Sequence, residues 1–122
     1  MTHILLDAHW ETGRGGGVWE TETSARYMLD ELCQRYNFTV LHRVFHFFEP
    51  QGMTCVYVLS ESHLSVHTWP EDDFVSIDLF CCRDLSQDVV HDILDYFQEK
   101  SGLVSMKSRV LHRVQARPPK SE

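Results

Sequence analysis

The stretch from Phe38 to Cys82 constrains the fold of this chain most, because it has the pattern of several strands in immediate succession. β-Branched and aromatic residues, which favour strands, dominate it, and short turns such as Glu49-Pro50-Gln51-Gly52 interrupt it. We predict four strands here, over residues 38–48, 54–60, 64–69 and 74–82. Strands joined by such short turns pair antiparallel, so we expect an antiparallel sheet at the centre of the fold.

One helical pattern precedes this run of strands and another follows it. Apolar residues between positions 25 and 36 recur at i, i+3, i+4 and i+7, which predicts a helix that begins at Thr21 or Thr23. A second helix is predicted over residues 85–100, with Ser86 as its N-cap.

The two ends of the chain are each predicted to add a strand. Residues 3–8 are short and apolar enough for one, and residues 103–114 form the other after Gly102 closes the second helix. The glycine-rich segment 9–17 is expected to hold no regular structure, because glycine loses much backbone entropy on ordering. Residues 117–122 are expected to form a solvated tail.

The predicted order is β-α-β-β-β-β-α-β, which fits a single domain of 122 residues. This order indicates an α+β fold, in which a mostly antiparallel β-sheet carries two helices on one face. Strands such as Val56-Tyr57-Val58-Leu59 are apolar on both faces, so the second face needs a cover that no third helix provides. We therefore expect a homodimer whose sheets pack face to face, in α/β/β/α layers.

Composition excludes several classes of protein. The charged side chains sum to 11 − 18 = −7, which argues against a general nucleic-acid binder. No apolar run approaches the about 20 residues that span a bilayer, and the first residues lack a signal-peptide pattern. We therefore expect a cytoplasmic protein without membrane association. Its four cysteines contain no C-x-x-C pair and are expected to be reduced thiols.

The densest polar segment, residues 60–71, is expected to lie between strands, where functional residues tend to collect. In a first interpretation, His63 and His67 point to the same face and bind zinc together with Cys81 or Cys82. The chain has 8 histidines, so such pairs arise readily by chance, and no metal site is predicted.

Two further interpretations of this segment stay open. A histidine could activate Ser62 or a cysteine for nucleophilic hydrolysis, although the chain has no G-x-S-x-G elbow. Alternatively, the segment is only a polar strand edge, and Trp69 is an ordinary core aromatic.

A longer stretch of sequence bears on the choice among these three interpretations. Residues 59–71, with the sequence LSESHLSVHTWPE, closely resemble the self-processing signature of the small bacterial S-adenosylmethionine decarboxylases. The resemblance continues through residues 76–82, and residues 44–54 are similar to the hairpin that precedes the signature in that family. In all, residues 38–82 align without an obvious gap.

The resemblance implies a decarboxylase that makes its own pyruvoyl group. In this family a serine hydroxyl attacks the preceding carbonyl, and β-elimination then breaks the chain. Here the break would fall between Glu61 and Ser62, giving residues 1–61 (β chain) and 62–122 (α chain). The pyruvoyl group derived from Ser62 would form a Schiff base with the substrate amine and act as an electron sink. The implied product is decarboxylated S-adenosylmethionine, the aminopropyl donor of spermidine biosynthesis.

The resemblance also implies roles for five other residues, taken by position. His67 matches the histidine that transfers protons during processing, and Thr54 stands where the family usually has a serine that assists it. Cys82 matches the proton donor in decarboxylation. Phe48 matches an aromatic that stacks on adenine, and Glu71 a carboxylate that holds the ribose hydroxyls.

In family members the active site is shared across the dimer, so Ser62 and Cys82 of one subunit would meet the other four residues in its partner. The Gly15–Gly17 loop, residues 9–12 and Phe47 depart from the usual family pattern, and all could affect substrate choice. They leave two alternatives open. One is a pyruvoyl decarboxylase of the same fold that acts on a basic amino acid, L-ornithine or L-arginine; the other is a non-catalytic dimeric relative.

Overall fold

In the computed structural model of the chain, which describes residues 1–114, the strands and helices follow the predicted order. The tail predicted at residues 117–122 lies outside the described residues. Two 3₁₀ turns, Gly17–Trp19 and Pro70–Asp72, supplement the predicted elements. The strands are β1 (Thr2–Trp10), β2 (Val40–Phe47), β3 (Met53–Leu59), β4 (Ser62–Trp69), β5 (Phe74–Cys81) and β6 (Leu103–His112), and the helices are α1 (Glu22–Arg35) and α2 (Gln87–Ser101).

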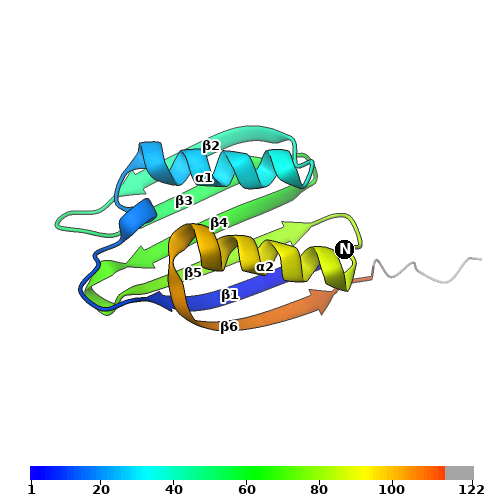
Figure 1. The fold of residues 1–122 in the computed structure, drawn as a ribbon. Coiled ribbons are helices and arrows are strands. Elements are labelled where there is room, and N and C mark those ends of the chain that lie inside the picture. Colours follow the sequence, from blue (N-terminus) through cyan, green and yellow to red (C-terminus); the bar gives the residue numbers. More distant parts are fainter. Residues whose placement is uncertain (115–122) are drawn as a thin grey trace, which may run out of the picture.

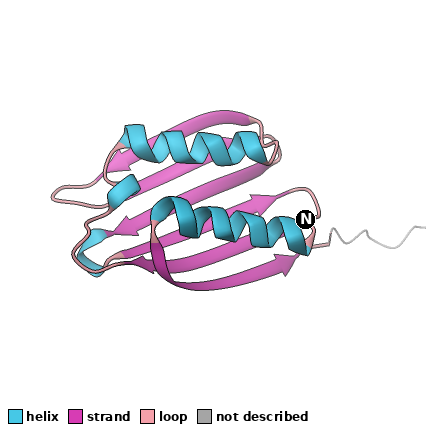
Figure 2. Ribbon diagram, in the orientation of Figure 1, coloured by secondary structure: helices cyan, strands magenta, loops and turns pink. Residues whose placement is uncertain are grey.

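The six strands form one sheet in the order β2-β3-β4-β5-β1-β6, and every neighbouring pair is antiparallel. Both helices lie on the same face of this sheet, side by side, and leave the other face open (Figures 1 and 2). The predicted α+β fold, a mostly antiparallel sheet with two helices on one face, is therefore confirmed. We call the uncovered side of the sheet the open face.

The hydrophobic core lies between the helices and the sheet. Alternate strand residues point into it, as in β1, where Ile4, Leu6 and Ala8 are almost fully buried. The helices contribute the apolar stripe on which their prediction rested, for example Leu29 of α1 and Ile93 of α2, neither of which is exposed at all.

Side chains and backbone caps fix the ends of the two helices. The Thr21 hydroxyl accepts a hydrogen bond from the Ser24 amide at the start of α1, and the Ser86 hydroxyl accepts one from Val89 at the start of α2. Gly102 ends α2 in the left-handed conformation with φ 63°, as predicted. Within residues 1–114, neither helix is long and apolar enough to cross a membrane.

Two strands extend two residues beyond a predicted end, whereas β2 and β6 each fall two residues short at one end. β4 begins at Ser62 instead of residue 64, so the strand takes in two more residues of the polar segment 60–71 than predicted. Pairing with β3 on one side and β5 on the other satisfies the backbone hydrogen bonds of β4. Its first residues therefore form a strand although they lack an alternating apolar pattern. Similarly, β1 continues to Trp10, into a segment predicted to be irregular, because β5 and β6 pair with it on both sides.

The open face is more polar than predicted. Val56 and Val58 of β3 do lie there, but the open-face positions of the central strands β4, β5 and β1 are mostly polar. One row of directly paired residues crosses the whole sheet and is polar throughout: His46, Thr54, His67, Ser76, Asp7 and Lys107. Any partner that covers this face must therefore match polar groups as well as apolar ones.

Candidate active site

Ser62 and Cys82 meet at one end of the sheet. Ser62 is the first residue of β4 and follows a two-residue turn, Ser60-Glu61, that joins β3 to β4. Cys82 comes directly after β5, and its backbone N–H donates a hydrogen bond to Ser62 Oγ at 3.1 Å. The structure therefore brings together the residue expected to be processed and the cysteine expected to act beside it.

Burial distinguishes Cys82 from the other cysteines. All four are free; Cys33, Cys55 and Cys81 are buried, whereas Cys82 is only half-buried. Burial raises the pKa of the Cys33 and Cys55 thiols to about 12, so both are held as neutral thiols at physiological pH. Cys82 is thus the least buried of the four cysteines.

Thr54 and His67 form a second pair on the open face. They lie directly opposite each other in β3 and β4, and Thr54 Oγ1 is 3.0 Å from His67 Nδ1. This contact fixes the ring through Nδ1, and Nε2 makes no hydrogen bond to any residue between 1 and 114. A histidine held in this way can accept or donate a proton at Nε2.

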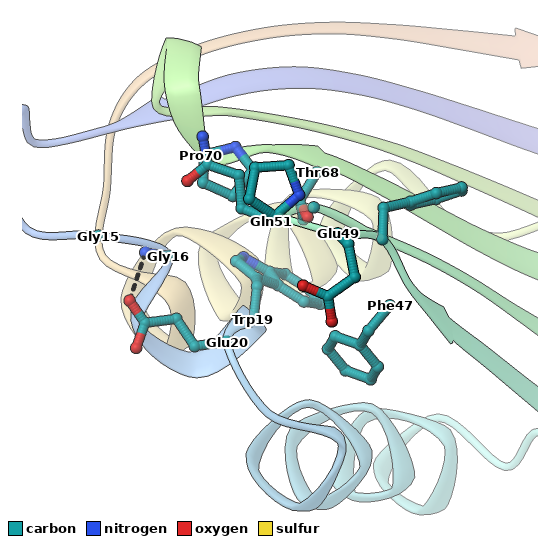
Figure 3. A pocket seen from close by; sticks show the side chains of 12 residues that line it. Gly15, Gly16, Trp19, Glu20, Phe47, Glu49, Gln51, Thr68 and Pro70 are labelled. Atoms are coloured by element: carbon teal, nitrogen blue, oxygen red, sulfur yellow. Dashed lines mark hydrogen bonds between the residues drawn. The ribbon is translucent and has the colours of Figure 1, made fainter.

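Phe48 and Glu71 lie at the end of the sheet away from Ser62. Phe48 sits in the turn between β2 and β3, is 50% exposed, and lines a pocket of about 490 Å³. Figure 3 shows this pocket from close by and labels Phe47 and Glu49, the neighbours of Phe48 in the chain. Glu71 lies in the 3₁₀ turn after β4 and is exposed; it does not line this pocket, although its neighbour Pro70 does.

The opposite wall of this pocket comes from the glycine-rich loop. Gly15 has φ +65°, a conformation that favours glycine, and a Cβ there would lie 2.3 Å from Glu20 Oε1 and would displace that carboxylate. The Gly16 amide donates to the same Glu20 carboxylate at 2.9 Å, which holds the loop in place (Figure 3). Trp19, almost fully buried, forms the floor. In the sequence, this loop stands out only as a departure from the family pattern. Its run of glycines was the available signal for a special role, but the residues that the glycines contact depend on the tertiary fold.

The six residues predicted for the site do not all come together in one chain. Ser62 and His67 are five residues apart on one extended strand, so their backbones are about 16 Å apart. Consequently His67 cannot reach Ser62 within a single chain. The arrangement is compatible with the expected sharing of the site between two subunits.

The open face also holds a hollow that sequence reasoning missed. It has a volume of about 410 Å³ and contains His67 together with charged residues of β1, β5 and β6. Ser76 donates to Asp7 at 2.9 Å at its rim, a contact between residues far apart in the sequence. No local motif signals such a cluster; only the register of the strands assembles it.

The two alternative chemistries find no support in this geometry. His63 pairs with Phe80 and His67 with Ser76, while Cys81 is buried on the helix-covered face, so these side chains do not converge. Within residues 1–114, no three His, Cys, Asp or Glu side chains are grouped as a metal site would require. In the same part of the chain, no histidine hydrogen-bonds Ser62, as the hydrolase interpretation would need.

Comparison with known proteins places this geometry in a family. The model of the S-adenosylmethionine decarboxylase family matches residues 16–113, which is most of the chain. The chain belongs to the S-adenosylmethionine decarboxylase family. The match confirms the resemblance based on residues 38–82 and extends it over both helices and β6.

Curated relatives in this family carry the name S-adenosylmethionine decarboxylase proenzyme. The chain is 35% identical to the one from Acidithiobacillus ferrooxidans over 85 residues, which cover 70% of this chain and 62% of that protein. It is 44% identical to one from Clostridium botulinum over 55 residues, 45% of this chain and 47% of that protein. The chain thus spans less than two thirds of the length of the curated relatives it matches.

A solved structure of this family has the same fold. The crystal structure of the adenosylmethionine decarboxylase from Aquifex aeolicus matches with a TM-score of 0.79 at 24% identity, covering 99% of this chain and 96% of that one. This likeness concerns the arrangement of strands and helices.

Proposed function

We propose that this chain is a self-processing, pyruvoyl-dependent decarboxylase that converts S-adenosylmethionine to decarboxylated S-adenosylmethionine, the aminopropyl donor of spermidine biosynthesis. The observation that carries the proposal is the contact between Ser62 and Cys82 at a strand end, in a chain of this family. Processing would cut between Glu61 and Ser62 and give chains of residues 1–61 and 62–122.

The surroundings of Ser62 fit a pyruvoyl group. Ser62 stands at a turn and is half-buried, so the cleaved end can stay beside Cys82 once the chain is cut. A pyruvoyl group at this position supplies the electron sink for loss of carbon dioxide. Cys82 Sγ, on the residue whose amide contacts Ser62, would hold the proton that is delivered to the substrate.

Completion of the site by a second subunit is part of the proposal. His67, fixed through Nδ1 by Thr54, faces outward from the open face and is too far from Ser62 in its own chain. Packing of two open faces, in α/β/β/α layers, would carry His67 of one subunit toward Ser62 of its partner. There, Nε2 would move a proton during self-cleavage.

The pocket at Phe48 would hold the nucleoside. The half-exposed Phe48 ring offers a face for adenine, and an aromatic face also attracts a sulfonium cation. The carboxylates of Glu20 and Glu49 in the pocket wall add negative charge, which suits a cationic substrate. Glu71, next to the pocket, would accept hydrogen bonds from the ribose hydroxyls.

Intact-mass spectrometry under denaturing conditions is the decisive experiment. The proposal expects two chains of about 7 kDa in place of one of 14.3 kDa, together with carbon dioxide release from S-adenosylmethionine. Ornithine and arginine serve as comparison substrates. A chain that stays whole after long incubation would contradict self-processing, and release from ornithine or arginine alone would contradict the substrate.

Mixing two inactive variants tests the shared site. Ser62→Ala and His67→Ala chains are each expected to remain whole when produced alone. When they are produced together, the His67→Ala chain should be cleaved, because its Ser62 meets His67 of the Ser62→Ala partner. If no cleavage follows from confirmed mixed dimers, the site is not shared in this way.

A further inference from the structure

We propose that Glu61 is a positioning residue whose strained backbone helps to drive self-cleavage at the Glu61–Ser62 bond. This inference rests on the proposed function, since it concerns how the processing step is made favourable. It is carried by the conformation of Glu61 and by the contacts on both sides of it.

Glu61 adopts a backbone conformation that its residue type avoids. Its φ is 59°, in the left-handed region, where a side chain crowds the carbonyl oxygen. Among residues 1–114, two other non-glycine residues share this region, Asn37 and Asp73. Asn and Asp tolerate it because their short polar side chains bond locally, whereas Glu does not have that advantage. Of these three residues, Glu61 is therefore the one whose residue type does not account for its positive φ.

The turn itself is also of an unfavourable kind. Leu59 pairs with Ser62, so Ser60 and Glu61 form a two-residue hairpin loop. The favoured loops of this length need positive φ at the first residue or at both, because only those match the twist of the strands. Here, of the two loop residues, Glu61 alone has positive φ. The loop thus works against the twist of the hairpin that it closes.

Contacts on both sides hold the loop in this state. The Ser60 amide donates to the Thr39 carbonyl at 2.9 Å, which ties the loop to the segment before β2. On the other side, the Cys82 amide holds Ser62 Oγ at 3.1 Å. A strained conformation persists when its surroundings determine it in this way, and such strain gathers at functional sites.

The Glu61 side chain has no part in this arrangement. It is exposed, and within the described part of the chain its carboxylate makes no hydrogen bond or ion pair. A substitution here therefore changes the conformational preference of the backbone without removing a contact.

Self-cleavage releases the strain. Ser62 Oγ attacks the Glu61 carbonyl carbon, an ester C–O bond forms, the C–N bond breaks, and the hydroxyl proton passes to the Ser62 nitrogen. Removal of the Ser62 Cα proton then breaks the Cβ–O bond and frees Glu61 as a carboxylate. Glu61 is no longer tied into the loop, so the strain present in the precursor is absent from the product. The part of this strain that is relieved as the C–N bond breaks lowers the barrier to cleavage.

Cleavage can be timed in chains made by pulse-labelled cell-free synthesis. Glu61→Gly adopts positive φ without strain and should slow cleavage by about five- to thirtyfold, the factor that matches the usual cost of a left-handed non-glycine residue. Glu61→Asn should be intermediate, and Glu61→Gln, which keeps the strain, should slow cleavage least. Asn37→Gly is the matched control, because it makes the same kind of change at a distant turn, and it should cleave like the parent chain.

A second measurement separates strain from a loss of order in the loop. In a Ser62→Ala background, which cannot cleave, Glu61→Gly should raise the thermal unfolding midpoint relative to Glu61→Gln. Equal cleavage rates for Glu61→Gly and the parent, equal slowing by Glu61→Gln, or a lowered midpoint for Glu61→Gly would each overturn the inference. If the parent chain itself never cleaves, the proposed function fails instead.

Discussion

Thr54 Oγ1 lies 3.0 Å from His67 Nδ1, across the pairing of β3 and β4 on the open face. Because this contact uses Nδ1, it sets the orientation of the imidazole and leaves Nε2 without a hydrogen bond to any residue between 1 and 114. The methyl group of Thr54, which distinguishes it from the serine usual in the family, does not prevent the contact.

The first prediction concerns this pair. Thr54→Val keeps the shape of the side chain but removes the hydroxyl, so His67 loses its orienting partner. Processing should slow by about two- to tenfold, the range expected for one hydrogen bond. Thr54→Ser keeps the hydroxyl and should process faster than Thr54→Val in a time course followed by intact mass. Equal rates for the two variants would remove Thr54 from processing.

The second prediction separates the two functions of Cys82. Its backbone N–H holds Ser62 Oγ, whereas its thiol is proposed to donate the proton in decarboxylation. Cys82→Ala retains the N–H, so the chain should still be cleaved but should lose most of its turnover. Ser62→Ala, by contrast, should stay whole and inactive. Normal carbon dioxide release by Cys82→Ala would exclude the thiol as the proton donor.

The sequence predicted the elements with local signals and missed features that depend on the tertiary fold. Both helices followed from apolar spacing and caps such as Ser86, and the order of the strands followed from their turns. The start of β4 at Ser62 was missed because pairing on both sides, and not alternation, makes it a strand. The Glu20 contact with Gly16 and the pairing of Asp7 with Ser76 leave no local pattern, so no reading of the sequence alone could place them.

The third prediction addresses the pocket. Removal of the Phe48 ring should weaken binding of S-adenosylmethionine by about two- to thirtyfold, the range for one cation–π or stacking contact. Glu71→Gln should weaken it because a neutral amide accepts less strongly from ribose hydroxyls. Calorimetry on a Ser62→Ala background measures both without turnover. Asp92→Asn, on the helix-covered side, serves as a charge-matched control, and unchanged affinity in both pocket variants would contradict the assignment.

The fourth prediction is that a thiol reagent distinguishes the cysteines. The pKa values of Cys33 and Cys55 are raised to about 12 by burial, so at pH 8 almost none of either is the reactive thiolate. Cys82 is half-buried and accessible. Peptide mapping after brief iodoacetamide treatment of the folded protein should find the label on Cys82 first, and Cys82→Ser should remove the fast phase. Early labelling of Cys33 or Cys55 would show that the core opens more easily than the structure indicates.

The fifth prediction concerns the contribution of a buried tyrosine of β3 to the stability of the fold. Tyr57 is fully buried, and its hydroxyl donates to Asp30 Oδ1 at 2.6 Å, while Arg43 Nε donates to the same oxygen at 2.9 Å. Asp30→Ala leaves the buried hydroxyl without this acceptor, which should lower the free energy of unfolding by about 1–3 kcal/mol. Glu31→Ala is the matched control, since it removes a neighbouring carboxylate whose partner Arg35 is exposed, and it should cost only about 0.3–0.5 kcal/mol. Urea unfolding followed by circular dichroism measures both. Equal losses would mean that the Tyr57–Asp30–Arg43 cluster contributes no more than a surface ion pair.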